Sequence, residues 1–201
     1  MALVLNGSGI TSANLVNGTI VDEDVADVAA SKLTGALPAI DGSALTGVGK
    51  VLQVVMGTKT DRATASTGQG VLTDIVNASI TPSSTSSKIL VQVMLTVTTY
   101  NSSDGAFAGI KRGSTVITQG SAPETRTACA TGGGNSGTAY NVNTISMSYL
   151  DSPSTTSATT YYGSANKRNG GTLYINRAYD DTDGVSRASA ICTIILMEIG
   201  A

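Results

Sequence analysis

The chain has 201 residues, with 12 Lys or Arg and 14 Asp or Glu, so its formal net charge is -2 at pH 7. This length suits one ordinary domain with an appendage, and the scattered basic residues argue against a nucleic-acid partner. The chain contains no histidine, which removes the commonest general base and transition-metal ligand. Only 13% of the residues are charged, and this predicts self-association, because charge is what keeps monomers apart.

The N-terminus has neither a basic start nor a long apolar run. It therefore predicts neither a signal peptide nor a membrane-spanning segment. We expect the chain to stay in the compartment where it is made until it is assembled.

Residues 1–48 carry apolar residues at a five-residue spacing, which fits neither a helix nor a strand. Turn-forming pairs such as Asn17-Gly18 lie between them, and Asp22 is a candidate cap for a short helix over 23–33. One such segment cannot enclose a core, whereas three copies wound together can. A flexible linker is the alternative. We expect an intertwined trimeric stalk whose core contains Leu5, Ile10, Leu15 and Ile20.

Residues 49–201 show candidate strands about every ten residues, a spacing typical of a β-sandwich or barrel. The predicted strands are 51–58, 71–80, 88–100, 106–111, 115–119, 125–130, 141–150, 159–166, 172–177 and 187–199. Turn-forming residues fall between many of them. We therefore expect an all-β protein, in which the stalk at 1–48 is followed by an antiparallel, jelly-roll-like β-sandwich head at 49–201.

Two of these strands carry a clear pattern. Every second residue of 89–97 is apolar, which predicts one face turned to a core. The last strand is apolar on both faces around Ile194 and Leu196, so one face needs a second surface. We expect Ile195 and Met197 to lie at a subunit interface of the head.

The ionisable residues do not predict an enzyme. Asp74, Glu124, Asp151 and Glu198 lie beside turn or edge signals, where a solvated carboxylate is the usual outcome. Cys129 and Cys192 are too few for a zinc site, and the sequence leaves open whether they pair. Asp180-Asp181-Thr182-Asp183-Gly184 is similar to part of a calcium loop but lacks the distal Glu, so a polar turn is the preferred interpretation. We predict no catalytic residues, no metal and no cofactor.

Tyrosine is the main aromatic residue of the chain, with seven copies. A ring with a polar tip can stack on a sugar, although alternate tyrosines in a strand also simply cover a sheet face. Tyr161, Tyr162 and Tyr179 are the candidate contacts to a glycan or a receptor.

Two stretches resemble phage structural proteins. Residues 9–35 and 40–48 resemble the repeat stems of tail-fibre and related proteins of cyanophages and marine phages. Residues 50–55, 80–91, 150–153, 171–177 and 196–199 are similar to the C-terminal modules of such proteins. The resemblance implies a virion-attached homotrimer without a cofactor, and it carries over no site residues.

We therefore expect a non-enzymatic fibre protein of a phage virion, made in the host cytoplasm. Its N-terminus would bind another virion protein, and its head would project towards a glycan or protein of the host surface, without membrane insertion. Modules of this kind usually end far longer fibres, so a capsid head fibre or decoration protein is the alternative. A virion-associated glycan hydrolase is a third hypothesis, and a cellular adhesin is disfavoured by the lack of an export signal.

Overall fold

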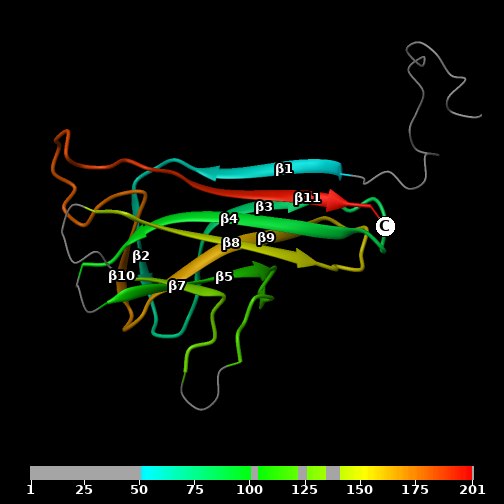
Figure 1. Ribbon diagram of the computed structural model, residues 1–201, viewed down its shortest axis with the longest axis horizontal. Coiled ribbons are helices and arrows are strands. Elements are labelled where there is room, and N and C mark those ends of the chain that lie inside the picture. Colours follow the sequence, from blue (N-terminus) through cyan, green and yellow to red (C-terminus); the bar gives the residue numbers. More distant parts are fainter. Residues whose placement is uncertain (1–50, 101–103, 122–125, 135–140, 201) are drawn as a thin grey trace, which may run out of the picture. The chain divides into compact units, whose positions relative to one another are not determined.

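The computed structural model describes residues 51–100, 104–121, 126–134 and 141–200, which form two antiparallel β-sheets and no helix (Figure 1). An all-β head is thus confirmed. The predicted stalk lies outside the described residues, together with its core positions Leu5, Ile10, Leu15 and Ile20 and the helix predicted at 23–33. Glu124 also lies outside them.

Sheet A is built around one long strand. It contains β1 (Val51–Lys59), β2 (Ala63–Thr67), β4 (Lys88–Thr98), β8 (Asn143–Asp151), β10 (Gly171–Ile175) and β11 (Cys192–Ile199). β4 pairs with β8 along one edge and with β11, then β10, along the other. β1 extends the sheet beyond β11, and β2 extends it beyond β10.

Sheet B contains β3 (Thr73–Ile80), β5 (Gly105–Arg112), β6 (Thr115–Val116), β7 (Thr131–Gly134) and β9 (Thr159–Lys167). β9 lies between β3 and β5. β6 and β7 pair with the other edge of β5.

Eight of these strands pair in a nested order. β1 pairs with β11, β3 with β9, β4 with β8, and β5 with β7, as in one long hairpin folded over on itself. The result is the order β1-β11-β4-β8 in sheet A and β3-β9-β5-β7 in sheet B. The two ends of the described head therefore meet, because Val51 pairs with Ile199.

The core combines inward side chains of both sheets. The alternate residues predicted in β4 are all buried, which confirms that prediction: Ile89, Val91, Val93, Leu95 and Val97. Sheet B contributes Ile80, Ile110 and Tyr161 among others. The sheets approach closely at Gly163, where a Cβ atom would lie 2.5 Å from Cγ1 of Val93.

Most predicted strands are present with shifted ends. The strand predicted at 125–130 is wrong, because residues 126–130 are irregular and the strand that pairs with β5 begins at Thr131. The last strand begins at Cys192 rather than at residue 187. β2 was not predicted, since its sequence of Ala, Thr and Ser contains no large apolar residue.

Candidate functional site

The outer face of sheet A, which points away from the core, is unusually apolar. We call seven of its side chains the apolar face: Val54, Met56, Leu90, Met94, Leu150, Ile195 and Met197. Val54 is 58% exposed, Met56 56% and Leu150 48%, whereas the other four are half-buried. Ile195 and Met197, the predicted interface residues of the head, lie on this face, while their neighbours Ile194 and Leu196 are fully buried in the core.

The strand register aligns these side chains across the sheet. Val54 is opposite Met197, Met197 is opposite Leu90, and Leu90 is opposite Leu150. Side chains that are directly opposite in an antiparallel pair lie on the same face and touch. One uninterrupted apolar row therefore crosses β1, β11, β4 and β8.

Two further rows continue the face towards the other end of β4. The next row contains Met56, Ile195, Gln92 and Ser148, and the one after it Thr58, Thr193, Met94 and Ser146. None of the twelve side chains in these three rows is ionisable.

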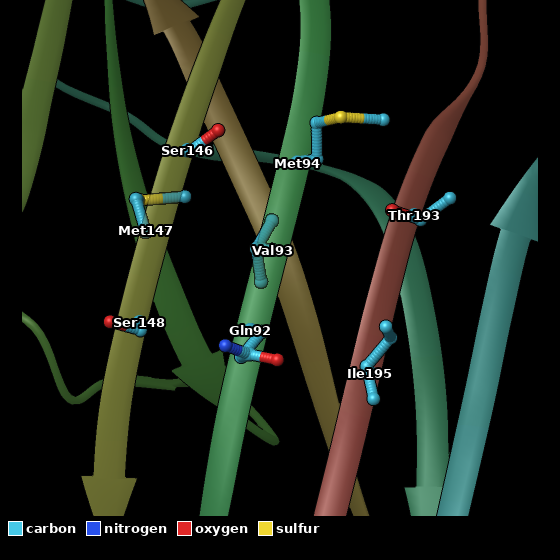
Figure 2. A pocket seen from close by; sticks show the side chains of 8 residues that line it. All are labelled: Gln92, Val93, Met94, Ser146, Met147, Ser148, Thr193 and Ile195. Atoms are coloured by element: carbon cyan, nitrogen blue, oxygen red, sulfur yellow. The ribbon is translucent and has the colours of Figure 1, made fainter.

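A shallow hollow of about 400 Å³ lies on this face, over β8, β4 and β11 (Figure 2). Its lining contains apolar, amide and hydroxyl groups without any ionisable group: Gln92, Val93, Met94, Ser146, Met147, Ser148, Thr193 and Ile195. A hollow of this composition can receive side chains of a partner, but it offers no acid, base or charged nucleophile.

The outer face of sheet B is polar by contrast. The carboxylate Oδ1 of Asp74 accepts hydrogen bonds from Ser164 Oγ at 2.6 Å and from Lys111 Nζ at 2.7 Å. The hydroxyls of Ser79 and Thr160 are 2.7 Å apart. The apolar character of sheet A is therefore a property of that face, not of the whole head.

The structure separates the three tyrosines predicted to contact a glycan. The prediction that Tyr161 contacts a ligand is wrong, because this residue is 0% exposed. Its hydroxyl donates a hydrogen bond of 2.6 Å to Asp151 Oδ2 inside the head. Burial and this bond raise the pKa of Tyr161 well above its usual value. A fully buried ring cannot touch a ligand on the surface, so Tyr161 has a structural role.

The other two tyrosines lie on different sheets. Tyr162 is on the outer face of sheet B, with Lys111 Nζ 5.9 Å from its ring centre. Tyr179 follows β10 and packs against Tyr100 and Tyr174. The sequence did not predict that Tyr100 and Tyr174 are neighbours of Tyr179. Tyr100 is 79 positions away from Tyr179 along the chain, and only the pairing of β4 with β10 brings these two residues together.

The candidate carboxylates are held by groups of the same chain. Both oxygens of Asp151 accept hydrogen bonds from Arg112 Nη1, at 3.1 and 2.8 Å. Glu198 is 0% exposed and accepts bonds from Ser83 N at 2.7 Å, Ser83 Oγ at 2.6 Å and Gln53 Nε2 at 2.6 Å. Burial by itself raises the pKa of Glu198, but the bonds from Ser83 and Gln53 lower it to about 2. Such a fixed, ionised group is a poor proton donor at neutral pH.

The carboxylates of Asp180 and Asp181 in the acidic turn at 180–184 are also bound by groups of the same chain. Asp180 accepts hydrogen bonds from the Thr182 hydroxyl at 2.7 Å and from Arg187 Nη2 at 2.7 Å, and contacts with these residues lower the pKa of Asp180 to about 2. Asp181 pairs with Arg62 at 2.9 Å and with Arg177 at 3.3 Å. In the described ranges, no group of three or more His, Cys, Asp or Glu residues could hold a metal ion.

The two cysteines are free. Cys192 is buried, and its Sγ donates to Asn176 Oδ1 at 3.0 Å. Burial raises the pKa of this thiol.

No helix in the described part of the chain has the length and apolarity needed to cross a bilayer. No protein-family model matches the chain, and a search of the curated proteins found no match.

Proposed function

We propose that this chain is a structural protein of a phage virion, a homotrimeric fibre with an N-terminal attachment segment and a projecting head that meets the host surface. The resemblance of its stem and head segments to phage fibre proteins suggests the virion. The observation that carries the proposal is the apolar face, which we take as the subunit interface of the head.

The size of the apolar face supports an interface. Four strands at about 4.8 Å spacing make a face roughly 19 Å wide, and its three rows cover on the order of a few hundred Å² of mostly apolar surface. Patches of that size on a monomer commonly mark an interaction site. Removing this surface from water is favourable by about 25 cal/mol per Å².

The composition of the face favours further copies of this chain as its partners. Because its rows contain no ionisable side chain, three copies facing one another would bury no unpaired charge. β1 carries Val54 and Met56, and it is the first strand after the proposed stalk in the chain. In the proposed fibre, the stalk is therefore followed in the chain by the strand that carries part of the apolar face.

The nested pairing of the strands supports the finer proposal of a jelly-roll head. Two Greek keys folded from one long hairpin are the topology of jelly rolls, an architecture used by viral capsid and lectin domains. Because one fold serves many functions, this topology agrees with the proposal without carrying it.

The oligomeric state of the full chain tests the proposal. Light scattering during size-exclusion chromatography should report about three times the protomer mass of 20.2 kDa. The double variant Met56→Glu/Leu150→Glu should report a smaller mass, because it places like charges inside the interface. Both residues are exposed in the protomer, so the variant should still melt cooperatively.

Asn77→Glu is the matched control, since Asn77 is an exposed residue of sheet B. Its mass should equal that of the unmodified chain. A monomer at micromolar concentration, or a dimer, would contradict the trimer. Immunogold labelling of purified virions should then decorate the tail, whereas capsid labelling would indicate a head fibre or decoration protein.

A further inference from the structure

Three tyrosine rings gather at one end of the head, and we call Tyr100, Tyr174 and Tyr179 the tyrosine cluster. The ring centres of Tyr100 and Tyr179 are 3.9 Å apart, and those of Tyr174 and Tyr179 are 5.2 Å apart in an edge-to-face arrangement. The whole chain contains only seven Tyr, one Phe and no Trp. Three of its eight aromatic residues thus meet at one place, and Tyr100 is 62% exposed there.

Arg177 holds the cluster in place. Its guanidinium lies 5.3 Å from the ring centre of Tyr174, and its Nη2 donates a hydrogen bond of 3.1 Å to the Tyr179 carbonyl. Asp181 pairs with the same guanidinium at 3.3 Å and with Arg62 at 2.9 Å. Because Tyr174 and the backbone of Tyr179 are held by the protein itself, a ligand would lose little affinity to ordering them.

The cluster lies at the end of the head opposite Val51, where the described head begins. Val51, where the described head begins, pairs with Ile199, which pairs in turn with Lys88 at the start of β4. Tyr174 pairs with Thr98 at the opposite end of this 11-residue strand (Figure 1). At about 3.3 Å per residue, the two ends are separated by roughly 30 Å.

The charged groups around the cluster are paired with one another, and Asp183 in the same turn brings the carboxylates to three against three guanidinium groups. Asp181 pairs with Arg62 and Arg177, and Asp180 pairs with Arg187 at 2.7 Å. A surface of aromatic rings with hydroxyl tips and neutralised charges matches the C–H faces and hydroxyl groups of a sugar. It lacks the excess charge that would select an acidic or basic peptide.

We propose that the tyrosine cluster is a binding site for neutral carbohydrate. That this carbohydrate belongs to the host surface rests on the proposed function, in which the chain is attached to the virion through residues 1–48.

The test uses the full chain on an array of immobilised neutral and acidic oligosaccharides. Because the chain has no Trp, its ultraviolet emission comes from tyrosine, and quenching of this emission by the same sugars in solution gives a second readout. At least one neutral oligosaccharide should bind. Tyr100→Ala and Tyr179→Ala should each weaken that binding about tenfold or more.

Tyr162→Ala and Tyr149→Ala are the matched controls, because these tyrosines lie outside the cluster and should bind as the unmodified chain does. Tyr179→Phe keeps the ring and should retain most of the affinity, even if Tyr179→Ala disturbs the loop. Binding of no neutral oligosaccharide, of acidic ones only, or equal binding by both alanine variants would overturn the proposal.

Light scattering of the same samples separates this inference from the proposed function. A trimer that binds no sugar overturns the carbohydrate site alone. A monomer that binds sugar through Tyr100 overturns the trimeric fibre alone.

Discussion

At the scale of single residues, Glu198 ties three segments of the head together. It belongs to β11, yet its donors come from Gln53 in β1 and from Ser83 in the loop before β4. Gln53 Nε2 also donates to the Thr81 carbonyl at 2.7 Å. These contacts fix the loop after β3 to the end of the head where Val51 and Ile199 meet.

The pKa of Glu198 makes this contact dependent on pH. Its value in the folded head is about 2, below the ordinary 4.5, so folding favours the carboxylate. The resulting stabilisation is present above about pH 4.5 and is lost as the pH falls towards 2.

Glu198→Gln should therefore lower the free energy of unfolding by about 1–3 kcal/mol at pH 7, since an amide NH₂ would face the Gln53 donor. Urea unfolding from pH 7 to 2 should show the gap between the two proteins closing below about pH 4.5. Asp183→Asn, in the acidic turn, is the control. Its free energy of unfolding should show no such gap to that of the unmodified chain. A gap that stays constant down to pH 2 would show that Glu198 does not titrate as described.

At the scale of elements, the head is closed along one side by the approach of β1 to β3. Each of these strands is at the edge of its sheet. A Cβ atom on Gly57 would lie 1.9 Å from the Asn77 carbonyl oxygen, so β1 can lie this close only because residue 57 has no side chain. The exposed edge strand that carries Val54 and Met56 thus depends on a glycine for its position.

Gly57→Ala should force β1 away from β3 and lower the free energy of unfolding by about 1–3 kcal/mol. Thermal melting of the two proteins measures the change. Thr58→Ala is the control, because Thr58 is the next residue of β1 and is exposed on the outer face. Equal melting temperatures for the Gly57 variant and the unmodified chain would mean that β1 can shift without cost.

At the scale of the whole molecule, the proposal assigns different tasks to the two parts of the chain. The head has its own core between sheets A and B, so we expect it to fold without residues 1–48. The pentad residues of the proposed stalk bury surface only against other copies.

Replacing Ile10, Leu15 and Ile20 by Ser should remove on the order of 2 kcal/mol of burial per site and per chain. Incorporation into virions, measured by mass spectrometry of purified particles, should be lost while the head still melts cooperatively. The control variant Thr11→Ser/Asn14→Ser/Thr19→Ser changes neighbouring polar residues and should assemble normally. Normal assembly of the first variant would instead indicate a flexible linker.

Features that depend on neighbouring residues could be predicted from the sequence. The alternation in β4 and the two apolar sides of β11 follow from the two-residue period of a strand, so the core face of β4 and the presence of a second apolar face on β11 were both readable. The same period does not say which face is the inner one. Tyr161 and Tyr162 are adjacent and chemically identical, and only the register of β9 buries the first and leaves the second outside.

The sequence by itself determined an all-β head and most of its strands, because strand formation follows from local alternation and turn residues. Only the tertiary structure decided the nested pairing, the four-strand apolar row, the tyrosine cluster and the donors to Glu198. The Ser83 bond to Glu198 spans 115 positions, and the row depends on three separate registers. Such contacts form because the two sheets bury one shared core, and that global packing, not any local pattern, selects which distant strands become neighbours.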